Sequence, residues 1–97
     1  MLSASEWAGY RASANRPVYV ASRFAAKEAF AKALGTGLRA PVLLTSISVV
    51  HDPLGRPLLH LTPELQALSE RRGVSAQHVT LTHERSVACA VVVLEAR

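Results

Sequence analysis

Small and hydrophobic side chains of this 97-residue chain follow a helical period in its first third and a strand period over much of the rest. Between residues 17 and 34 they recur three or four positions apart, which predicts a long helix. The small residues of this helix share one stripe and would allow close packing on a sheet: Val18, Ser22, Ala25, Ala26, Ala29 and Ala33. Gly35 and Gly37 end the pattern, because glycine accepts the left-handed backbone that closes many helices.

A shorter helix is predicted before the long one. Ser3 or Ser5 can cap its first turn, and Glu6 completes a capping box with Ser3. We expect this helix to end near Asn15. Pro17 then suits the first turn of the long helix, where the N–H that proline lacks would have no partner within the helix.

Four strands are predicted in the second half of the chain, as two hairpins. Residues 43–51 and 57–61 form the first, and the sequence DPLG at residues 52–55 joins them with Pro at its second position and Gly at its fourth. Residues 77–83 and 86–95 form the second hairpin. Both hairpins imply antiparallel pairing.

The unbroken apolar run VVVL at residues 91–94 predicts a strand that is covered on both faces. We expect it to be the best-protected strand of the protein. Cys89, the single cysteine, lies just before this run and is therefore expected to be a buried free thiol with no chemical role.

A short helix separates the two hairpins, and its start and stop are both marked. Thr62 caps it, the helix continues to about Arg72, and Leu65 and Leu68 supply its apolar contacts. The elements together predict an α+β fold with a mostly antiparallel sheet packed with helices. With no repeat, linker or low-complexity segment, residues 1–97 are expected to form a single domain.

The charge balance favours an acidic partner. The formal net charge is +4 and the isoelectric point is near 10. Nucleic acid would suit this charge as well, but the basic residues form no tract, and five aromatic residues give few stacking platforms, so we expect no nucleic acid partner. No apolar stretch approaches the roughly 18 residues of a membrane span, so we expect a cytoplasmic protein without a membrane partner.

The most informative motif is RFAAKEAFAKALGTG, residues 23–37. At about 100° per residue, Arg16, Arg23 and Lys27 share one side of the helix, and Glu28 lies one turn before Lys32. Such a set of cations around one carboxylate suits phosphate and metal binding. A simpler interpretation is an ordinary surface pair between Glu28 and Lys32, which contributes a few tenths of a kcal/mol.

Taken whole, this motif closely resembles the signature of holo-acyl-carrier-protein synthases, small bacterial members of the 4′-phosphopantetheinyl transferase superfamily. The segment HVTLTHE at residues 78–84 looks like the family's strand of the form His-hydrophobic-Ser-Leu-Ser-His-acid. The segment ISVVHDPLGRP at residues 47–57 is also similar to the family's strand, turn and Pro-bearing strand. The resemblance therefore covers nearly the whole chain and implies the family's fold.

The resemblance has one gap. Family members begin with a strand of the form Gly-x-Asp-hydrophobic, whose Asp binds magnesium, followed by a helix with an Arg that helps to dock the carrier protein. Residues 1–7 instead resemble a later Leu-Thr-x-x-Glu segment. We therefore expect a domain that lacks its first strand and helix, through natural loss or a misassigned start.

The resemblance implies a Mg²⁺-dependent transferase. Its members move the 4′-phosphopantetheine group of coenzyme A to a serine of apo acyl carrier protein and release adenosine 3′,5′-bisphosphate. Their active sites lie between the subunits of a trimer, so a homotrimer is implied here. This places the chain in fatty acid biosynthesis and lipid metabolism, although the sequence does not distinguish a fatty-acid carrier protein from a polyketide one.

Site residues carry over from the family's motif. Glu28 matches the magnesium ligand, and Lys27 and Lys32 match lysines near the phosphates of coenzyme A. Glu28 or Lys32 could also accept the serine proton. His83 matches a histidine near coenzyme A. The loop beside the nucleotide corresponds to Gly35, Thr36 and Gly37, and Arg23 is expected to face either the coenzyme or the carrier protein.

Two functions of different classes remain open from the sequence. One is an active transferase, in which water, Asp52 or Glu84 completes the magnesium site with Glu28. The other is an inactive truncated remnant that binds coenzyme A or carrier protein without turnover.

Overall fold

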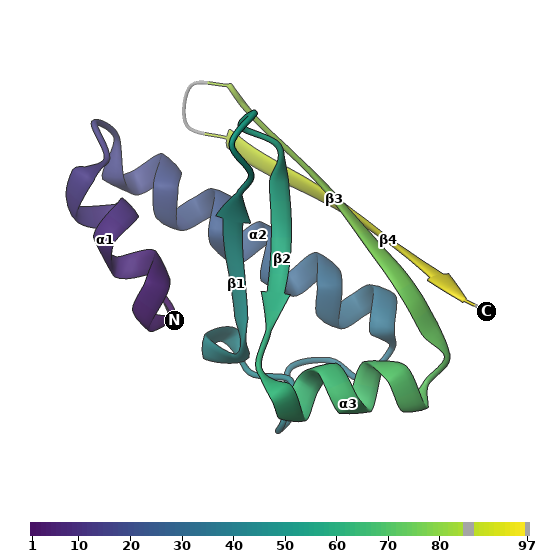
Figure 1. Cartoon of the computed structure of the whole chain (residues 1–97). Helices are drawn as coiled ribbons and strands as arrows, with labels where there is room; N and C mark the ends of the chain where they lie inside the picture. Colours follow the sequence, from purple (N-terminus) through teal and green to yellow (C-terminus); the bar gives the residue numbers. More distant parts are fainter. Residues whose placement is uncertain (85–86, 97) are drawn as a thin grey trace.

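A computed structural model describes residues 1–84 and 87–96 of the chain (Figure 1). The elements are, in order, helix α1 (Ala4–Ala12), helix α2 (Arg16–Leu34), a short 3₁₀ turn (Leu44–Ser46), strands β1 (Ile47–His51) and β2 (Pro57–Leu61), helix α3 (Pro63–Arg71), and strands β3 (Val74–Glu84) and β4 (Val87–Ala96). The α+β class is thus confirmed. No helix in the described ranges combines the length and hydropathy needed to cross a membrane.

The first helix starts at a predicted cap, Ser3. Ser3 and Glu6 form the capping box of α1, with the Ser3 N–H donating to Glu6 Oε1 at 3.0 Å. The helix ends at Ala12, earlier than predicted, because Asn15 caps the next helix instead: its side-chain oxygen accepts from the Val18 N–H at 3.2 Å. A cap residue has non-helical backbone angles, so α1 cannot extend through Asn15.

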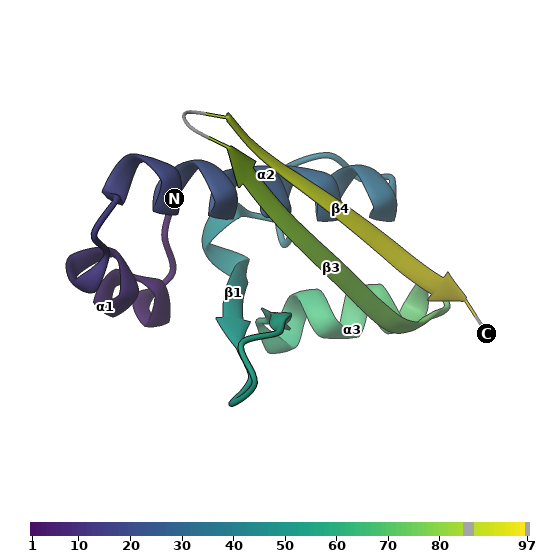
Figure 2. The ribbon, with the colours of Figure 1, turned by 90° about the horizontal axis from the view of Figure 1, so that it is seen from above.

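The four strands form two separate antiparallel pairs and not one continuous sheet. In the first pair, Ile47 faces Leu61 and His51 faces Pro57. The turn between them is built as predicted, since the Gly55 N–H donates to the Asp52 carbonyl oxygen at 2.9 Å and Gly55 has a φ of 88°. The long β3–β4 hairpin crosses α2 and reaches α3 at the end where β3 begins (Figure 1, Figure 2).

Strand β3 starts earlier than the predicted residue 77. Helix α3 ends at Arg71, and Gly73 turns the chain with a φ of 84°, so the strand begins directly at Val74. Thr62 caps α3 as predicted, accepting from the Leu65 N–H at 3.4 Å. The strand therefore begins three residues earlier than predicted.

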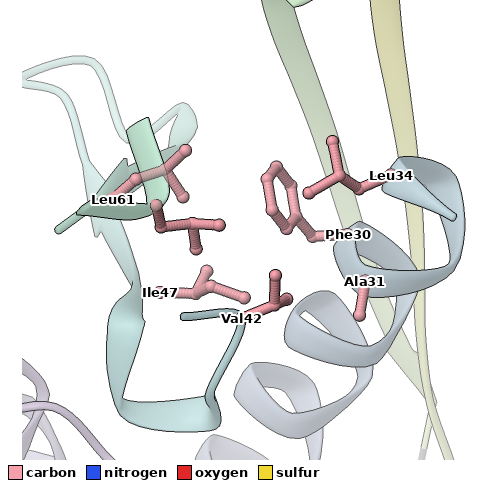
Figure 3. Close-up of a cluster of buried hydrophobic side chains, with 7 residues drawn as sticks. Phe30, Ala31, Leu34, Val42, Ile47 and Leu61 are labelled. Atoms are coloured by element: carbon pink, nitrogen blue, oxygen red, sulfur yellow. The ribbon is translucent and has the colours of Figure 1, made fainter. Parts of the chain in front are cut away.

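The hydrophobic core lies between α2, the first hairpin and α3 (Figure 3). Phe30, Ala31 and Leu34 project from α2 toward Ile47 and Leu61, and Val42 and Leu65 complete the cluster. Phe30, Ile47 and Leu65 are fully buried. Burying a side chain of this size contributes about 1.5–3 kcal/mol, so this cluster fixes how α2 lies against the strands.

The buried stripe of α2 differs from the predicted small-residue stripe. Ser22 and Ala26 are buried as expected, but Ala33 is exposed, and larger side chains such as Phe30 and Leu34 occupy the buried face. Leu34, which is buried, follows the exposed Ala33 by one position, and a helix turns about 100° per residue. The buried face is therefore rotated by about 100° from the predicted stripe. The same rotation carries Lys27 into the interior.

Strand β4 is not covered on both faces within this chain, so that prediction is wrong. Its side chains alternate, and Val91 and Val93 are 61% and 53% exposed. Cys89 lies on the same exposed face, which corrects the prediction of a buried thiol. The best-protected strand is β1, where Ile47 and Val49 are 0% and 3% exposed.

Candidate functional site

Lys27 of the motif is held in an interior ion pair. Its side chain is 0% exposed, and its ammonium group donates to Glu6 Oε1 at 2.5 Å and to the Met1 carbonyl oxygen at 2.8 Å. The other oxygen of Glu6 accepts from the Val49 N–H at 2.9 Å. Burial lowers the pKa of Lys27 by removing water from the charged form, and Glu6 opposes that shift.

This ion pair corrects two expectations. Lys27 does not share an accessible side of α2 with Arg23, since its side chain is fully buried and paired with Glu6. The partner is Glu6, which the sequence marked only as a capping residue. Its 21-residue separation from Lys27 left no local pattern that could predict the contact.

Two of the predicted coenzyme contacts, Arg23 and His83, line the same pocket. It has a volume of about 460 Å³ and lies between the start of α2, the β1–β2 turn and the end of β3. The polar side chains around it include Ser13, Asn15, Tyr19 and His51. No pattern in the sequence marks His51 as a site residue. Its place in this pocket could be found only from the fold, because the β1–β2 hairpin carries it to α2.

Arg23 enters this pocket with one hydrogen-bonding group unused. The Arg23 guanidinium carbon lies 3.7 Å from the centroid of the Tyr19 ring, so the two planes are in close contact. Arg23 Nε is buried and has no hydrogen-bond partner among the described residues. Arginine carries five N–H donors in a fork that matches phosphate or carboxylate oxygens. The pocket is therefore suited to an anion.

Glu28 and Lys32 lie further along α2, on the solvent-accessible part of the helix. Glu28 is half-buried and Lys32 is exposed. The ion pairs found among residues 1–84 and 87–96 do not include one between them. The simpler interpretation of an ordinary Glu28–Lys32 surface pair is thus not supported, and the Glu28 carboxylate has no ion-pair partner among the described residues.

The predicted glycine loop lies at the other end of α2. Gly35 and Gly37 have φ values of 86° and 67°, which glycine adopts without strain. Gly35 and Thr36 line a second pocket of about 380 Å³ together with Arg39 and Arg72. Neither arginine belongs to a sequence motif that predicts a ligand contact.

Apart from His83, the predicted site residues lie along α2 and in the turn that follows it, and the two pockets lie at the two ends of this segment. Gly35 follows Arg23 by 12 positions, which corresponds to about 18 Å along a helix axis. Glu28 and Lys32 lie between them. This arrangement suits an extended, negatively charged ligand that contacts several turns of α2, with a carboxylate near its middle.

A metal at this site would have to be held by few protein groups. Groups of three His, Cys, Asp or Glu side chains with metal-binding geometry do not occur among the described residues. Asp52 is engaged in the β1–β2 turn, where its carboxylate accepts from the Arg56 backbone N–H at 2.8 Å, a bond that lowers the pKa of Asp52. Mg²⁺ often uses one or two carboxylates together with substrate phosphates and water. Glu28 fits that mode of binding.

Comparison with known proteins agrees with the resemblance found in the sequence. Residues 1–92 match the family model described as the 4′-phosphopantetheinyl transferase superfamily. The holo-[acyl-carrier-protein] synthase of Thiobacillus denitrificans is 52% identical over 95 residues, which are 98% of this chain and 72% of that protein.

Solved structures give the same result for the fold. The crystal structure of holo-[acyl-carrier-protein] synthase from Neisseria meningitidis matches with a TM-score of 0.93 at 38% identity, over 97% of this chain and 75% of that one. The Bacillus anthracis synthase, solved in complex with CoA (3′,5′-ADP), matches with a TM-score of 0.82 at 32% identity, over 99% and 76% of the two chains. The chain belongs to the 4′-phosphopantetheinyl transferase superfamily and, within it, to the family of holo-acyl-carrier-protein synthases.

Proposed function

We propose that this protein transfers the 4′-phosphopantetheine group from coenzyme A to a serine of an apo acyl carrier protein and releases adenosine 3′,5′-bisphosphate. One observation carries the proposal: Arg23, Glu28, Lys32 and the Gly35 turn lie along one helix between two pockets. The net charge of +4 suits both an acidic carrier protein and the phosphates of coenzyme A. Cys89 has no second cysteine in the chain to pair with, which suits a reducing cytoplasm.

We assign the phosphate contacts to residues at both ends of α2. Arg23 and His83 would hold one phosphate of coenzyme A in the pocket at the start of the helix. Gly35, Thr36 and Gly37 would approach the nucleotide at its end, where glycine allows close contact with the backbone. The fully buried Lys27 is left out of this set.

Magnesium dependence is part of the proposal, with Glu28 as the protein ligand. When bound, Mg²⁺ would neutralise the charge that develops as the phosphoanhydride bond breaks. The exposed Lys32, one turn away, would stabilise the leaving phosphate by its positive charge. The serine hydroxyl must lose a proton, and Glu28 or Lys32 would accept it, because both are ionisable and accessible on the same helix.

A homotrimer is also proposed, with the exposed face of β4 as its contact surface. Val87, Val91 and Val93 are 61%, 61% and 53% exposed on this face. A row of three valines in water is costly, and burial against another subunit would recover about 25 cal/mol per Å². The same burial would explain why the sequence of β4 is typical of a strand covered on both faces.

Replacing Val91 by Lys is expected to dissociate this assembly into monomers. Desolvating an unpaired ammonium group in an apolar contact costs several kcal/mol. Sedimentation equilibrium of the substituted and unsubstituted chains would measure the change in mass. Leu54→Lys is the matched control, since Leu54 is 95% exposed in the β1–β2 turn, away from the β4 face. A Val91→Lys chain with the mass of the unsubstituted assembly would exclude this surface.

The release of adenosine 3′,5′-bisphosphate tests the proposed reaction. It should accumulate only when the chain, coenzyme A and apo carrier protein are all present, and it should match the amount of modified carrier. A carrier with its acceptor serine replaced by alanine is the control. Binding of coenzyme A without any release would favour the alternative of a remnant that binds but does not turn over.

A further inference from the structure

Tyr19 lies at the junction of α1 and α2, where three independent contacts fix its ring. The Tyr19 hydroxyl donates to the Glu6 carbonyl oxygen at 2.6 Å. The ring of Tyr10 meets it edge-on at a centroid distance of 6.2 Å. Gly9 leaves room for it, since a Cβ at that position would lie 2.5 Å from the Tyr19 hydroxyl oxygen. The local sequence thus holds this aromatic ring in one place.

The ring in turn fixes Arg23. Arg23 follows Tyr19 by four positions on α2, so the two side chains are neighbours on one face of the helix, and the guanidinium carbon lies 3.7 Å from the ring centroid. Stacking on an aromatic face restricts a side chain that otherwise has four rotatable bonds. Both residues line the pocket at the start of α2, so the ring restricts Arg23 at the edge of this pocket.

The arrangement leaves the buried Nε atom of Arg23 without a hydrogen-bond acceptor in the described part of the chain. Buried donors are nearly always hydrogen-bonded, because leaving one without a partner is unfavourable. Arg23 Nε has no partner among residues 1–84 and 87–96. Two histidines, His51 and His83, line the same pocket, so its polar lining presents ring nitrogens beside the positive charge of Arg23. An oxyanion would satisfy the Nε donor and bind a second guanidinium N–H beside it.

We infer that Tyr19 is a positioning residue, which holds the Arg23 guanidinium group ready to bind a phosphate of coenzyme A in this pocket. The inference rests on the proposed function, because that function supplies the phosphate. Pre-organising Arg23 means that less rotational freedom is lost when the ligand binds. Tyr19 therefore contributes to affinity without touching the ligand.

Calorimetric titration of coenzyme A into four variants of the full chain tests this inference. Arg23→Ala should weaken binding by about tenfold or more, since it removes a charged hydrogen bond. Tyr19→Leu should weaken it by about tenfold, since the stacking face is lost. Tyr19→Phe keeps that face and should bind within about twofold of the unsubstituted chain, although it loses the hydroxyl bond to Glu6. Thermal unfolding of each variant reports whether it is folded.

The double variant with Tyr19→Leu and Arg23→Ala distinguishes a positioning role of Tyr19 from a general disruption of the pocket. If Tyr19 acts through Arg23, adding Tyr19→Leu to Arg23→Ala should weaken binding no further. The inference would be overturned if the two substitutions reduced the affinity for coenzyme A independently, so that their effects multiplied in the double variant. It would also be overturned if Tyr19→Phe and Tyr19→Leu reduced the affinity equally. Undiminished binding by Tyr19→Leu would overturn it as well, while the proposed function would stand. Failure of the unsubstituted chain to bind coenzyme A would overturn both.

Discussion

Replacing Glu6 by alanine is expected to lower the free energy of unfolding by about 3–5 kcal/mol. Glu6 and Lys27 are both 0% exposed and form an ion pair at 2.5 Å. Removing the carboxylate leaves the Lys27 ammonium group buried without its counter-charge and leaves the Val49 N–H without its acceptor. Urea unfolding followed by circular dichroism would measure the loss.

Two further variants distinguish the ion pair from a general effect of substitution. Glu64→Ala is the matched control, because Glu64 is exposed in the first turn of α3. This substitution should lower the free energy of unfolding by well under half as much as Glu6→Ala. The double substitution of Glu6 by Leu and Lys27 by Met removes both charges together, and it should be less destabilising than Glu6→Ala alone. A loss below about 1 kcal/mol for Glu6→Ala would contradict a structural role for the pair.

Replacing Glu28 by glutamine is expected to reduce magnesium-dependent transfer at least 100-fold. Glutamine has the size of glutamate but no charge, so it would hold Mg²⁺ poorly while filling the same space. Loss of several kcal/mol of charge stabilisation in the transition state corresponds to a rate effect of this size or larger. The ratio kcat/KM, measured over a range of magnesium concentrations, checks the expectation.

The same variant should fold normally, which separates a chemical effect from a structural one. Glu28 forms no ion pair with another described residue, so its charge is not needed to hold α2 in place. We expect the midpoint of urea unfolding to change little. Glu64→Gln is the matched control for activity and should transfer at the unsubstituted rate. Full activity of Glu28→Gln would refute its role as the magnesium ligand.

Local sequence signals predicted most of the fold. Capping residues such as Ser3 and Thr62 act on backbone groups within three positions, so their effects can be inferred without tertiary information. The turn at Asp52 and Gly55 is likewise a local feature. The strand and helix patterns between these signals gave the order of all seven helices and strands in the described part of the chain.

Contacts between distant segments could not be predicted in the same way. Lys27 belongs to a motif that suggests a surface cation, yet Glu6 and the Met1 carbonyl oxygen hold it in the interior. The face of β4 with Val91 and Val93 was expected to be buried because its composition is apolar, yet both side chains are exposed in this chain. Sequence pattern indicates which side chains prefer burial, but not which partner buries them.

Only part of the candidate site could be predicted, because some of its residues come together through contacts between distant segments. Arg23 and His83 were identified by their motifs, and the fold brings them to one pocket. Tyr19 and His51 join that pocket through the packing of α1 on α2 and the path of the β1–β2 hairpin. Neither contribution has a signature in the local sequence.

The mass of apo acyl carrier protein, incubated with this chain, coenzyme A and magnesium, tests the central claim most directly. Intact-mass spectrometry should show the carrier gaining the mass of one 4′-phosphopantetheine group, and the gain should disappear when magnesium is removed by a chelator. A complete holo-acyl-carrier-protein synthase, run in parallel, establishes that the carrier can be modified. An unmodified carrier in the presence of this chain, together with full modification by the complete synthase, would contradict the proposed transferase activity.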